Sequence, residues 1–185
     1  MAFTMMFQGK AAERAFYNVD WGVGYGAPSH KIDTMLVQAL MHVFYYEQEG
    51  VLYPTNNAAP IKTNPPLAQS SISIDGILGP ATQAHIDTFQ DNLRAAGWAM
   101  RVDHRMDPTR ESPVATIQKE LYSIFLLNRS CNNNDVMNGT QFFMNLRWRE
   151  DMPISLRSAL RTTKKLAAQY SGGGGGHPAA IKHAA

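Results

Sequence analysis

Residues 74–90, IDGILGPATQAHIDTFQ, constrain the fold most, because a turn, a helix start and a helix face follow one another within them. Asp75 and Gly76 favour a tight turn, since glycine accepts a positive φ and aspartate can bond its own nearby backbone. Gly79 and Pro80 then open a helix, because proline suits the first helical position, where its missing N–H is not needed. The stretch therefore predicts a turn that leads directly into a helix.

The predicted helix has one apolar face. Ile86, Phe89 and Leu93 follow Pro80 at helical spacing, which is typical of a helix that packs on a core. Gly97, preceded by two alanines, indicates where the helix stops.

The string D-G-x-x-G-P-x-T, followed by an apolar face that ends in Phe-Gln, resembles the peptidoglycan-binding domain of the small three-helix type, which is found beside cell-wall hydrolases. The matching residues are Asp75, Gly76, Gly79, Pro80, Thr82, Ile86, Phe89 and Gln90. A looser similarity extends to about half of the chain. The resemblance implies a mainly α fold, with a three-helix peptidoglycan-binding-like domain over residues 28–130, and bacterial peptidoglycan as the ligand.

The resemblance also implies a set of ligand-binding residues. They are Asp75, Gly76, Gly79, Thr82, Asp103 and Arg105. Residue chemistry favours structural roles for two of them. An aspartate before glycine commonly bonds the turn backbone, and a threonine hydroxyl can serve a helix start.

The template recurs along the chain. Residues 103–108 repeat the spacing from aspartate to proline of residues 75–80. Ten residues after each of three prolines stands a glutamine, and the neighbouring apolar positions also match; these glutamines are Gln38, Gln90 and Gln118. Amphipathic periodicity explains the apolar positions but does not require glutamine each time, so duplication or family resemblance is favoured over chance.

Two further helices complete the predicted core. The first starts at Ser29 and runs towards Tyr46 or Gln48, with its apolar face formed by Ile32, Leu36, Ala39, Leu40 and Val43. The pair Val37-Gln38 is similar to the first helix of the family. The third helix starts near Ser112 and continues to about Asn128, after which CNNNDVMNG, residues 131–139, breaks the chain.

The segments before and between these helices are expected to be extended or irregular. Residues 1–27 form an extended N-terminal arm, in which Trp21, Val23 and Tyr25 share one side of a strand. The arm packs either on its own domain or on a neighbouring subunit, and the sequence does not choose between these. Residues 51–71, with four prolines, form a long irregular loop.

Residues 131–170 are predicted to be a C-terminal strand-plus-helix extension. Residues 140–148 begin a helix or form a strand with Phe142, Met144, Leu146 and Trp148 on one side, and the extended interpretation is favoured. Pro153 opens a last helix, with its apolar face formed by Leu156, Leu160, Thr163, Ala167 and Tyr170 and its basic stripe by Arg157, Arg161, Lys164 and Lys165. Residues 171–185 read as a Gly-rich flexible tail.

Charge is unevenly distributed along the chain. Residues 1–146 carry ten Lys/Arg and thirteen Asp/Glu, or −3, whereas residues 147–170 carry six and two, or +4. An anionic partner is expected to meet the C-terminal segment. Charged helix stripes are commonly only solvated, and no aromatic residues interleave with this one, so nucleic acid is not the expected partner.

No catalytic or metal chemistry is predicted, and no cofactor is expected. The single cysteine, Cys131, lies in a polar stretch without a nearby histidine, and the six histidines show no metal-ligand spacing. Asp103 and His104 could be read as an acid–base pair, but adjacent turn residues usually diverge, and a surface or packing histidine is favoured.

These observations favour a noncatalytic, peptidoglycan-binding-like structural subunit of a phage virion or injection-type assembly that meets the bacterial cell wall. Residues 1–14 lack the basic region of a signal peptide, and no apolar run reaches the length of a membrane span, which favours synthesis in the cytoplasm and assembly into a particle. Expected partners are peptidoglycan and self or neighbouring subunits, contacted through the arm and the tail. The alternatives are a scaffold without glycan affinity and, less favoured, an accessory protein of a wall hydrolase.

Overall fold

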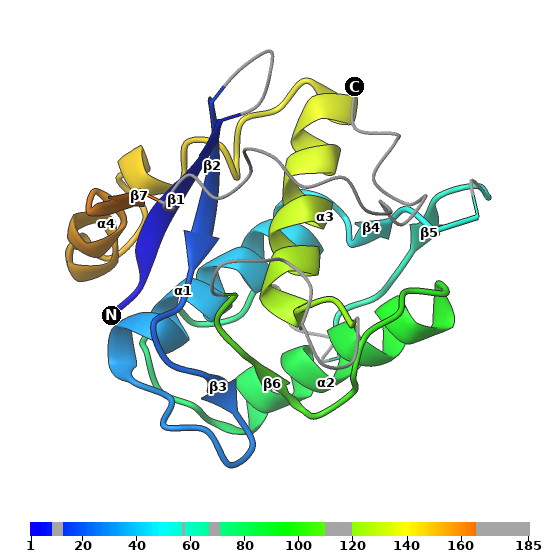
Figure 1. Ribbon diagram of the computed structural model, residues 1–185, viewed down its shortest axis with the longest axis horizontal. Helices are drawn as coiled ribbons and strands as arrows, with labels where there is room; N and C mark the ends of the chain where they lie inside the picture. Colours follow the sequence, from blue (N-terminus) through cyan, green and yellow to red (C-terminus); the bar gives the residue numbers. More distant parts are fainter. Residues whose placement is uncertain (9–12, 57, 67–70, 110–119, 166–185) are drawn as a thin grey trace, which may run out of the picture.

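The computed structural model describes residues 1–8, 13–56, 58–66, 71–109 and 120–165 (Figure 1). The fold is mixed α/β and mainly helical. The helices are α1 (Lys31–His42), a π-helical turn η1 (Val43–Glu47), α2 (Pro80–Ala95), α3 (Ser123–Asn138), a 3-10 turn η2 (Leu146–Trp148) and α4 (Ile154–Leu160). The strands are β1 (Phe3–Gln8), β2 (Glu13–Asn18), β3 (Val23–Gly24), β4 (Val51–Leu52), β5 (Ile61–Lys62), β6 (Arg105–Met106) and β7 (Thr163–Lys165).

The first two predicted helices, for which the sequence shows a start and an apolar face, are confirmed. Helix α2 begins at Pro80 and ends at Ala95, and Ile86, Phe89 and Leu93 are fully buried. Helix α1 with η1 covers the range expected for the first helix, and its predicted apolar face is buried apart from Ile32, which is partly buried against the core.

The contact between these two helices combines an aromatic pair with a buried histidine. The rings of Phe44 and Phe89 meet edge to face, with their centroids 5.3 Å apart. His85 Nδ1 lies 2.7 Å from the Ala81 carbonyl oxygen, which can only accept, so Nδ1 carries a proton. Tyr46 Oη lies 2.9 Å from His85 Nε2 and donates to it when the ring is neutral. Burial lowers the pKa of His85, which favours this neutral form.

The N-terminal segment packs on its own chain. Strands β1 and β2 pair antiparallel, and β1 also pairs in parallel with β7, which gives a three-stranded sheet in the order β2-β1-β7. Its buried side chains include Ala2, Phe3, Met5, Phe16, Tyr17 and Val19. The expectation that Trp21, Val23 and Tyr25 share one side of a strand is wrong. Val23 is fully buried and the other two are exposed, because β3 spans only two residues and Gly24 takes φ +120°.

The third helix and the segment before it differ from the prediction. Helix α3 begins at Ser123, and residues 120–122 are not helical, so no single helix runs from 112 to 128; residues 110–119, with Gln118, lie outside the described part. The break expected at residues 131–139 is wrong, since α3 continues through Cys131 to Asn138 and ends at Gly139, which is left-handed with φ +66°. Helix α3 therefore crosses the expected boundary between residues 130 and 131.

Tertiary contacts explain why this Asn-rich stretch is helical. The Asn128 side chain receives a hydrogen bond from Tyr17 N at 2.8 Å and donates to Tyr17 O at 2.9 Å, so it pairs with strand β2. Asn134 Nδ2 donates to Val51 O at 3.1 Å. These bonds give the Asn128 amide and the Asn134 Nδ2 group partners outside α3, so these groups do not compete for the helix backbone, and the low helix propensity of asparagine is overridden.

The C-terminal segment also departs from the prediction. Residues 142–145 form turns that lead into η2, so the extended interpretation of residues 140–148 is wrong. Helix α4 ends at Leu160 and β7 follows it, so the helix precedes the strand. The predicted basic stripe is therefore divided, because Arg157 lies in α4 whereas Lys164 and Lys165 lie in β7. Residues 51–71 contain a short hairpin, β4 with β5, within the expected irregular loop. Ala167, Tyr170 and the tail lie outside the described residues.

A buried carboxylate holds the connection after α3. Asp135 is fully buried and accepts from the backbone N–H groups of Phe142, Phe143 and Met144 at 3.1, 2.9 and 3.0 Å. It also accepts from the Thr140 hydroxyl at 2.7 Å and from Gln48 Nε2 at 2.8 Å. One carboxylate therefore satisfies backbone donors that no helix or strand uses here.

We predict that Asp135→Asn lowers the free energy of unfolding by about 3 kcal/mol, because the amide cannot accept all of these bonds and leaves buried donors unpaired. Urea unfolding followed by circular dichroism measures the change. The matched control is Asp91→Asn, at an exposed position of α2, for which we expect a change within about 0.5 kcal/mol. Equal effects of the two substitutions would contradict the role of the buried carboxylate.

We also predict a pH-dependent stability from His85. Because the pKa of His85 is lowered in the folded state, the unfolded chain binds a proton more readily than the folded chain. The free energy of unfolding therefore loses nothing to His85 above the ordinary histidine pKa of about 6.5, and it falls as the pH drops below that value. The slope is at most about 1.4 kcal/mol per pH unit for one proton. Thermal or urea unfolding between neutral and mildly acidic pH measures it. His85→Gln removes the titrating group and flattens this dependence.

Candidate functional site

The first sequence motif is held by a glutamine from the preceding helix. Gln38 of α1 is buried, and its Oε1 accepts from Gly76 N at 2.8 Å. Its Nε2 lies within hydrogen-bond distance of three acceptors, which are Asp75 Oδ1 at 2.9 Å, Ile77 O at 3.1 Å and Thr82 Oγ1 at 3.0 Å. The Gln38 amide thus fixes both the turn and the start of α2.

Asp75 serves this turn rather than an open site. Its Oδ1 accepts from Ile77 N at 2.8 Å as well as from Gln38. These hydrogen bonds to the backbone and to Gln38 lower the pKa of Asp75, because they favour the charged carboxylate. Gly76 takes φ +78°, and a Cβ there would lie 2.6 Å from the Lys31 carbonyl oxygen, so the position requires glycine.

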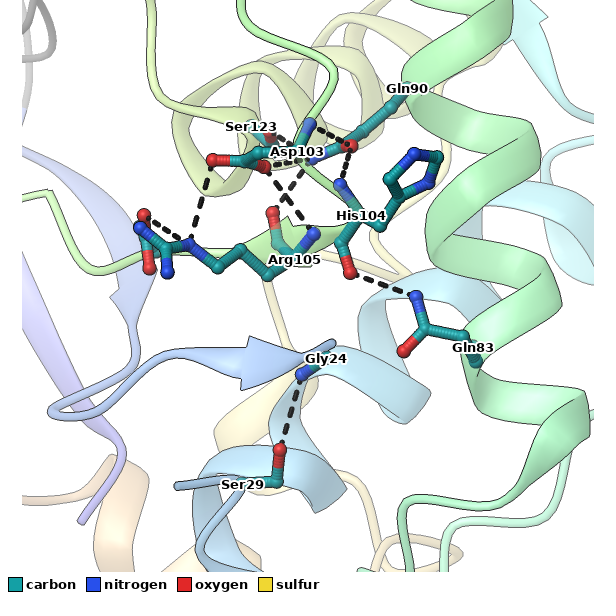
Figure 2. A network of polar contacts seen from close by, with 9 residues as sticks. Gly24, Ser29, Gln83, Gln90, Asp103, His104, Arg105 and Ser123 are labelled. Atoms are coloured by element: carbon teal, nitrogen blue, oxygen red, sulfur yellow. Dashed lines mark hydrogen bonds and ion pairs between the residues drawn. The ribbon is translucent and has the colours of Figure 1, made fainter. Parts of the chain in front are cut away.

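A second glutamine holds a second turn (Figure 2). Gln90 of α2 is buried, and its Oε1 accepts from His104 N at 2.8 Å and Asp103 N at 3.2 Å. Its Nε2 lies 3.1 Å from Asp103 Oδ1, 2.7 Å from Arg105 O and 2.8 Å from Ser123 Oγ. Gln90 therefore joins the second turn to the start of α3, as Gln38 joins the first turn to the start of α2.

The two networks use corresponding groups. Asp103 takes the place of Asp75, and His104, with φ +62°, takes the left-handed place of Gly76. The Ser123 hydroxyl accepts from Gln90 as the Thr82 hydroxyl accepts from Gln38, although the sequence repeat does not align these two residues. The sequence repeat of glutamines ten residues after proline is therefore a structural repeat for Gln38 and Gln90. The corresponding Gln118 lies outside the described residues.

Strand β6 joins the second turn to the N-terminal segment. Gly24 N donates to Ser29 Oγ at 3.2 Å, and Tyr25 N donates to His104 O at 3.0 Å. Gln83 Nε2 donates to the same carbonyl at 2.8 Å, as Figure 2 shows. A Cβ at Gly24 would lie 2.5 Å from His104 O, so the close approach of the two strands requires glycine there.

A cavity of about 180 Å³ lies beside the second turn. Its polar lining comes mainly from Arg101, Asp103, Arg105, Asp107 and Glu120. Arg105 Nε lies 3.0 Å from Asp107 Oδ2 and 3.5 Å from Asp103 Oδ2, and burial raises the pKa of Asp107. Guanidinium and carboxylate groups face one small space, so the cavity can bind a polar ligand that carries both an acid and an amine.

The six predicted ligand-binding residues do not form one site. Asp103 and Arg105 line the cavity. Asp75, Gly76 and Thr82 belong to the Gln38 network, and Gly79 is the residue just before α2. The resemblance grouped residues of both turns as one set of ligand-binding residues, whereas the structure places the two turns in separate networks. Sequence reasoning missed Gln38 and Gln90 as the residues that organise the turns, although their repeated position was the available signal.

Other chemistry finds little support in the described part of the chain. Among those residues no group of three or more His, Cys, Asp and Glu is placed to hold a metal ion. Cys131 is fully buried, its Sγ lies 3.7 Å from the Leu40 carbonyl oxygen, and burial raises the pKa of its thiol well above the ordinary value, so the reactive thiolate is disfavoured. No helix within the described ranges is long and apolar enough to cross a membrane.

Comparison of the chain with protein-family models, with curated proteins and with solved structures gives no significant match.

We predict opposite outcomes for the two equivalent left-handed positions. Gly76→Ala lowers the free energy of unfolding by about 2 kcal/mol or more, because the added Cβ meets the Lys31 backbone in a left-handed conformation. His104→Gly leaves it unchanged or raises it by up to about 1 kcal/mol, since glycine relieves the left-handed strain and the lost pair with Asp87 is exposed. Urea unfolding of both variants measures the difference. A loss of stability in His104→Gly as large as that in Gly76→Ala would contradict the equivalence.

Proposed function

We propose that this chain is a noncatalytic peptidoglycan-binding-like module that acts as a structural subunit of a phage virion or injection-type assembly meeting the bacterial cell wall. One observation carries the proposal. The residues that match the family string, Asp75, Gly76 and Thr82, bond to Gln38, the glutamine of the similar first helix. Residues that define the resemblance therefore act together as one unit.

The order of elements is consistent with the three-helix architecture of this family. Helices α1, α2 and α3 follow one another, and the glutamine that holds the turn after each of the first two also bonds a hydroxyl in the first turn of the next helix. The strands β1, β2 and β7 add a small sheet to this core. In the proposed architecture the sheet is an addition specific to this chain.

The cavity beside the second turn is the proposed wall-binding site. Peptidoglycan stem peptides present carboxylates and amines, and the cavity offers Arg101 and Arg105 beside Asp103, Asp107 and Glu120. Arg105 is partly exposed, with 39% of its side chain accessible, so its guanidinium can exchange an internal carboxylate for one on a ligand. The first turn contributes to the fold, because Asp75 Oδ1, Gly76 N and Thr82 Oγ1 are already hydrogen-bonded to Gln38.

A scaffold without glycan affinity is the second candidate. The hydrogen bonds of Asp75, Gly76 and Thr82 to Gln38 also favour this candidate. A motif whose residues bond within the chain can be retained for folding alone. A role as an accessory protein of a wall hydrolase is less favoured. Hydrolysis of purified sacculi that disappears on a single substitution in this chain would overturn the noncatalytic assignment.

Co-sedimentation with insoluble peptidoglycan tests the proposal. We predict that the protein pellets with peptidoglycan at low and moderate salt and that Arg105→Gln weakens binding about tenfold or more, because a charge-assisted hydrogen bond is lost. The matched control is Arg94→Gln, an exposed arginine at the end of α2 that does not line the cavity. Absence of the wild-type protein from the pellet at both salt concentrations would leave the scaffold as the function.

A further inference from the structure

Arg105, at the cavity beside the second turn, meets two carboxylates that differ in what else they bind. Its Nε lies 3.0 Å from Asp107 Oδ2 and 3.5 Å from Asp103 Oδ2. Asp103 belongs to the turn, because its Oδ1 accepts from Gln90 Nε2 at 3.1 Å and from Arg105 N at 3.3 Å. Within the described residues, Asp107 accepts its hydrogen bond from Arg105 Nε. Asp107 is therefore the carboxylate whose charge depends most on Arg105.

The surroundings of Asp107 disfavour its charged form. The side chain is partly buried, and a Cβ added at Gly22 would lie 2.8 Å from Asp107 Oδ1, so the segment before β3 lies directly against the carboxylate. Burial is the largest influence and raises the pKa of Asp107, and the charge of Asp103 acts in the same direction. Arg105 and Arg101 oppose this rise without cancelling it. A further loss of positive charge near Asp107 would therefore favour its protonation.

The other titratable groups of the described chain that line the cavity come from two segments. The turn with β6 contributes Arg101, Asp103 and Arg105, and the residues before α3 contribute Glu120 and Tyr122. The segment before β3 presents the uncharged Gly22 to Asp107. With Asp107 included, two arginines face three carboxylates, so the cavity holds no excess of positive charge. A ligand carboxylate brought to Arg105 therefore meets like charges beside the guanidinium.

Arg105 can bind a ligand carboxylate without first leaving Asp107. A guanidinium has five N–H donors, and the hydrogen bond to Asp107 uses Nε. The Arg105 side chain is 39% exposed, so its remaining donors can reach a ligand in the cavity. Whether the ligand shares Arg105 with Asp107 or replaces Asp107, the Asp107 carboxylate gains a negative neighbour and loses attraction to the guanidinium. Both changes favour the protonated form of Asp107.

We propose that a carboxylate ligand bound at Arg105 brings a proton from solvent onto Asp107, so that the cavity takes up its ligand and a proton together. The inference rests on the wall-binding site of the proposed function and adds the regulation of that site. Affinity is highest below the pKa of Asp107 in the free protein, and it falls as the pH rises through the higher pKa of Asp107 in the complex. The ligand must itself stay charged, which sets the acidic limit near the ordinary α-carboxyl pKa of about 3.5.

NMR titration of the full chain with dialanine tests the proton uptake, because dialanine carries one amine and one carboxylate. We expect dialanine to bind about tenfold more tightly near pH 4.5 than at neutral pH, the factor that follows when the pKa of Asp107 is higher by about one in the complex. The signal of the Asp107 side-chain carboxyl carbon locates the proton directly, since its titration midpoint moves to higher pH when dialanine is present. Dialanine amide, which lacks the carboxylate, is expected to leave that midpoint unmoved.

Asp107→Asn separates proton uptake from a role in positioning Arg105. The amide keeps an oxygen that can accept from Arg105 Nε but carries no charge, so we expect about tenfold tighter binding of dialanine at neutral pH and no dependence on Asp107 protonation. Asp151→Asn is the matched control, because Asp151 also stands two residues after its arginine, accepts from Arg149 Nε at 3.1 Å and does not line the cavity. Circular dichroism melting confirms that each variant is folded. Weaker binding by a folded Asp107→Asn variant would assign Asp107 to positioning and overturn the proposal.

The outcomes for proton uptake and for wall binding are distinguishable. A protein that pellets with peptidoglycan but binds dialanine equally at every pH, or does not bind it, keeps the wall-binding function and overturns the proton uptake. A protein that binds dialanine with proton uptake but stays out of the pellet loses the wall-binding function and keeps the inference. Movement of the Glu120 midpoint in place of the Asp107 midpoint would assign the proton to Glu120 and overturn the proposal.

Discussion

The placement of α2 and α3 depends on one kind of interaction, a buried glutamine amide that binds the turn after its own helix. An amide suits this role because it offers donors and an acceptor without a charge that burial would penalise. Gln38 and Gln90 each bind a backbone N–H of a left-handed residue and a hydroxyl at the next helix start. Each glutamine thereby satisfies turn groups that secondary structure leaves unpaired, and it sets where the next helix begins.

The sequence predicts a helix or turn correctly where the interactions that form it join residues close together in the chain. The bounds of α2 follow from Pro80 at its start and an apolar face of fixed period, so they were predicted closely. The recurrence of glutamine was visible, but the partners of Gln90 lie 13 to 33 positions away, and no local pattern identifies them. The cavity residues Asp103 and Arg105 were reached only through the family resemblance, and Ser123 was missed because it does not occupy the position of Thr82 in the sequence repeat, which here holds Arg110.

The failures share a physical cause, which is that distant partners override local preference. Polar residues such as Asn134 predict a break, yet the Asn134 amide donates to Val51 at the start of β4, and α3 continues. Asp135 fixes a loop through backbone donors that carry no sequence signal. Likewise, the run after Leu160 has helical periodicity but pairs with β1, because a strand there completes the edge of the N-terminal hairpin.

The parallel pairing of β1 with β7 has a consequence for the order in which the chain can fold. The Thr4 hydroxyl binds the Leu160 carbonyl, a contact between residues 156 positions apart in the sequence. During synthesis β1 emerges before its partner β7, which follows helices α1, α2, α3 and α4 in the chain. Closure of so long a loop is slow relative to helix formation, so we infer that the helices with their glutamine-held turns form early and the sheet closes last.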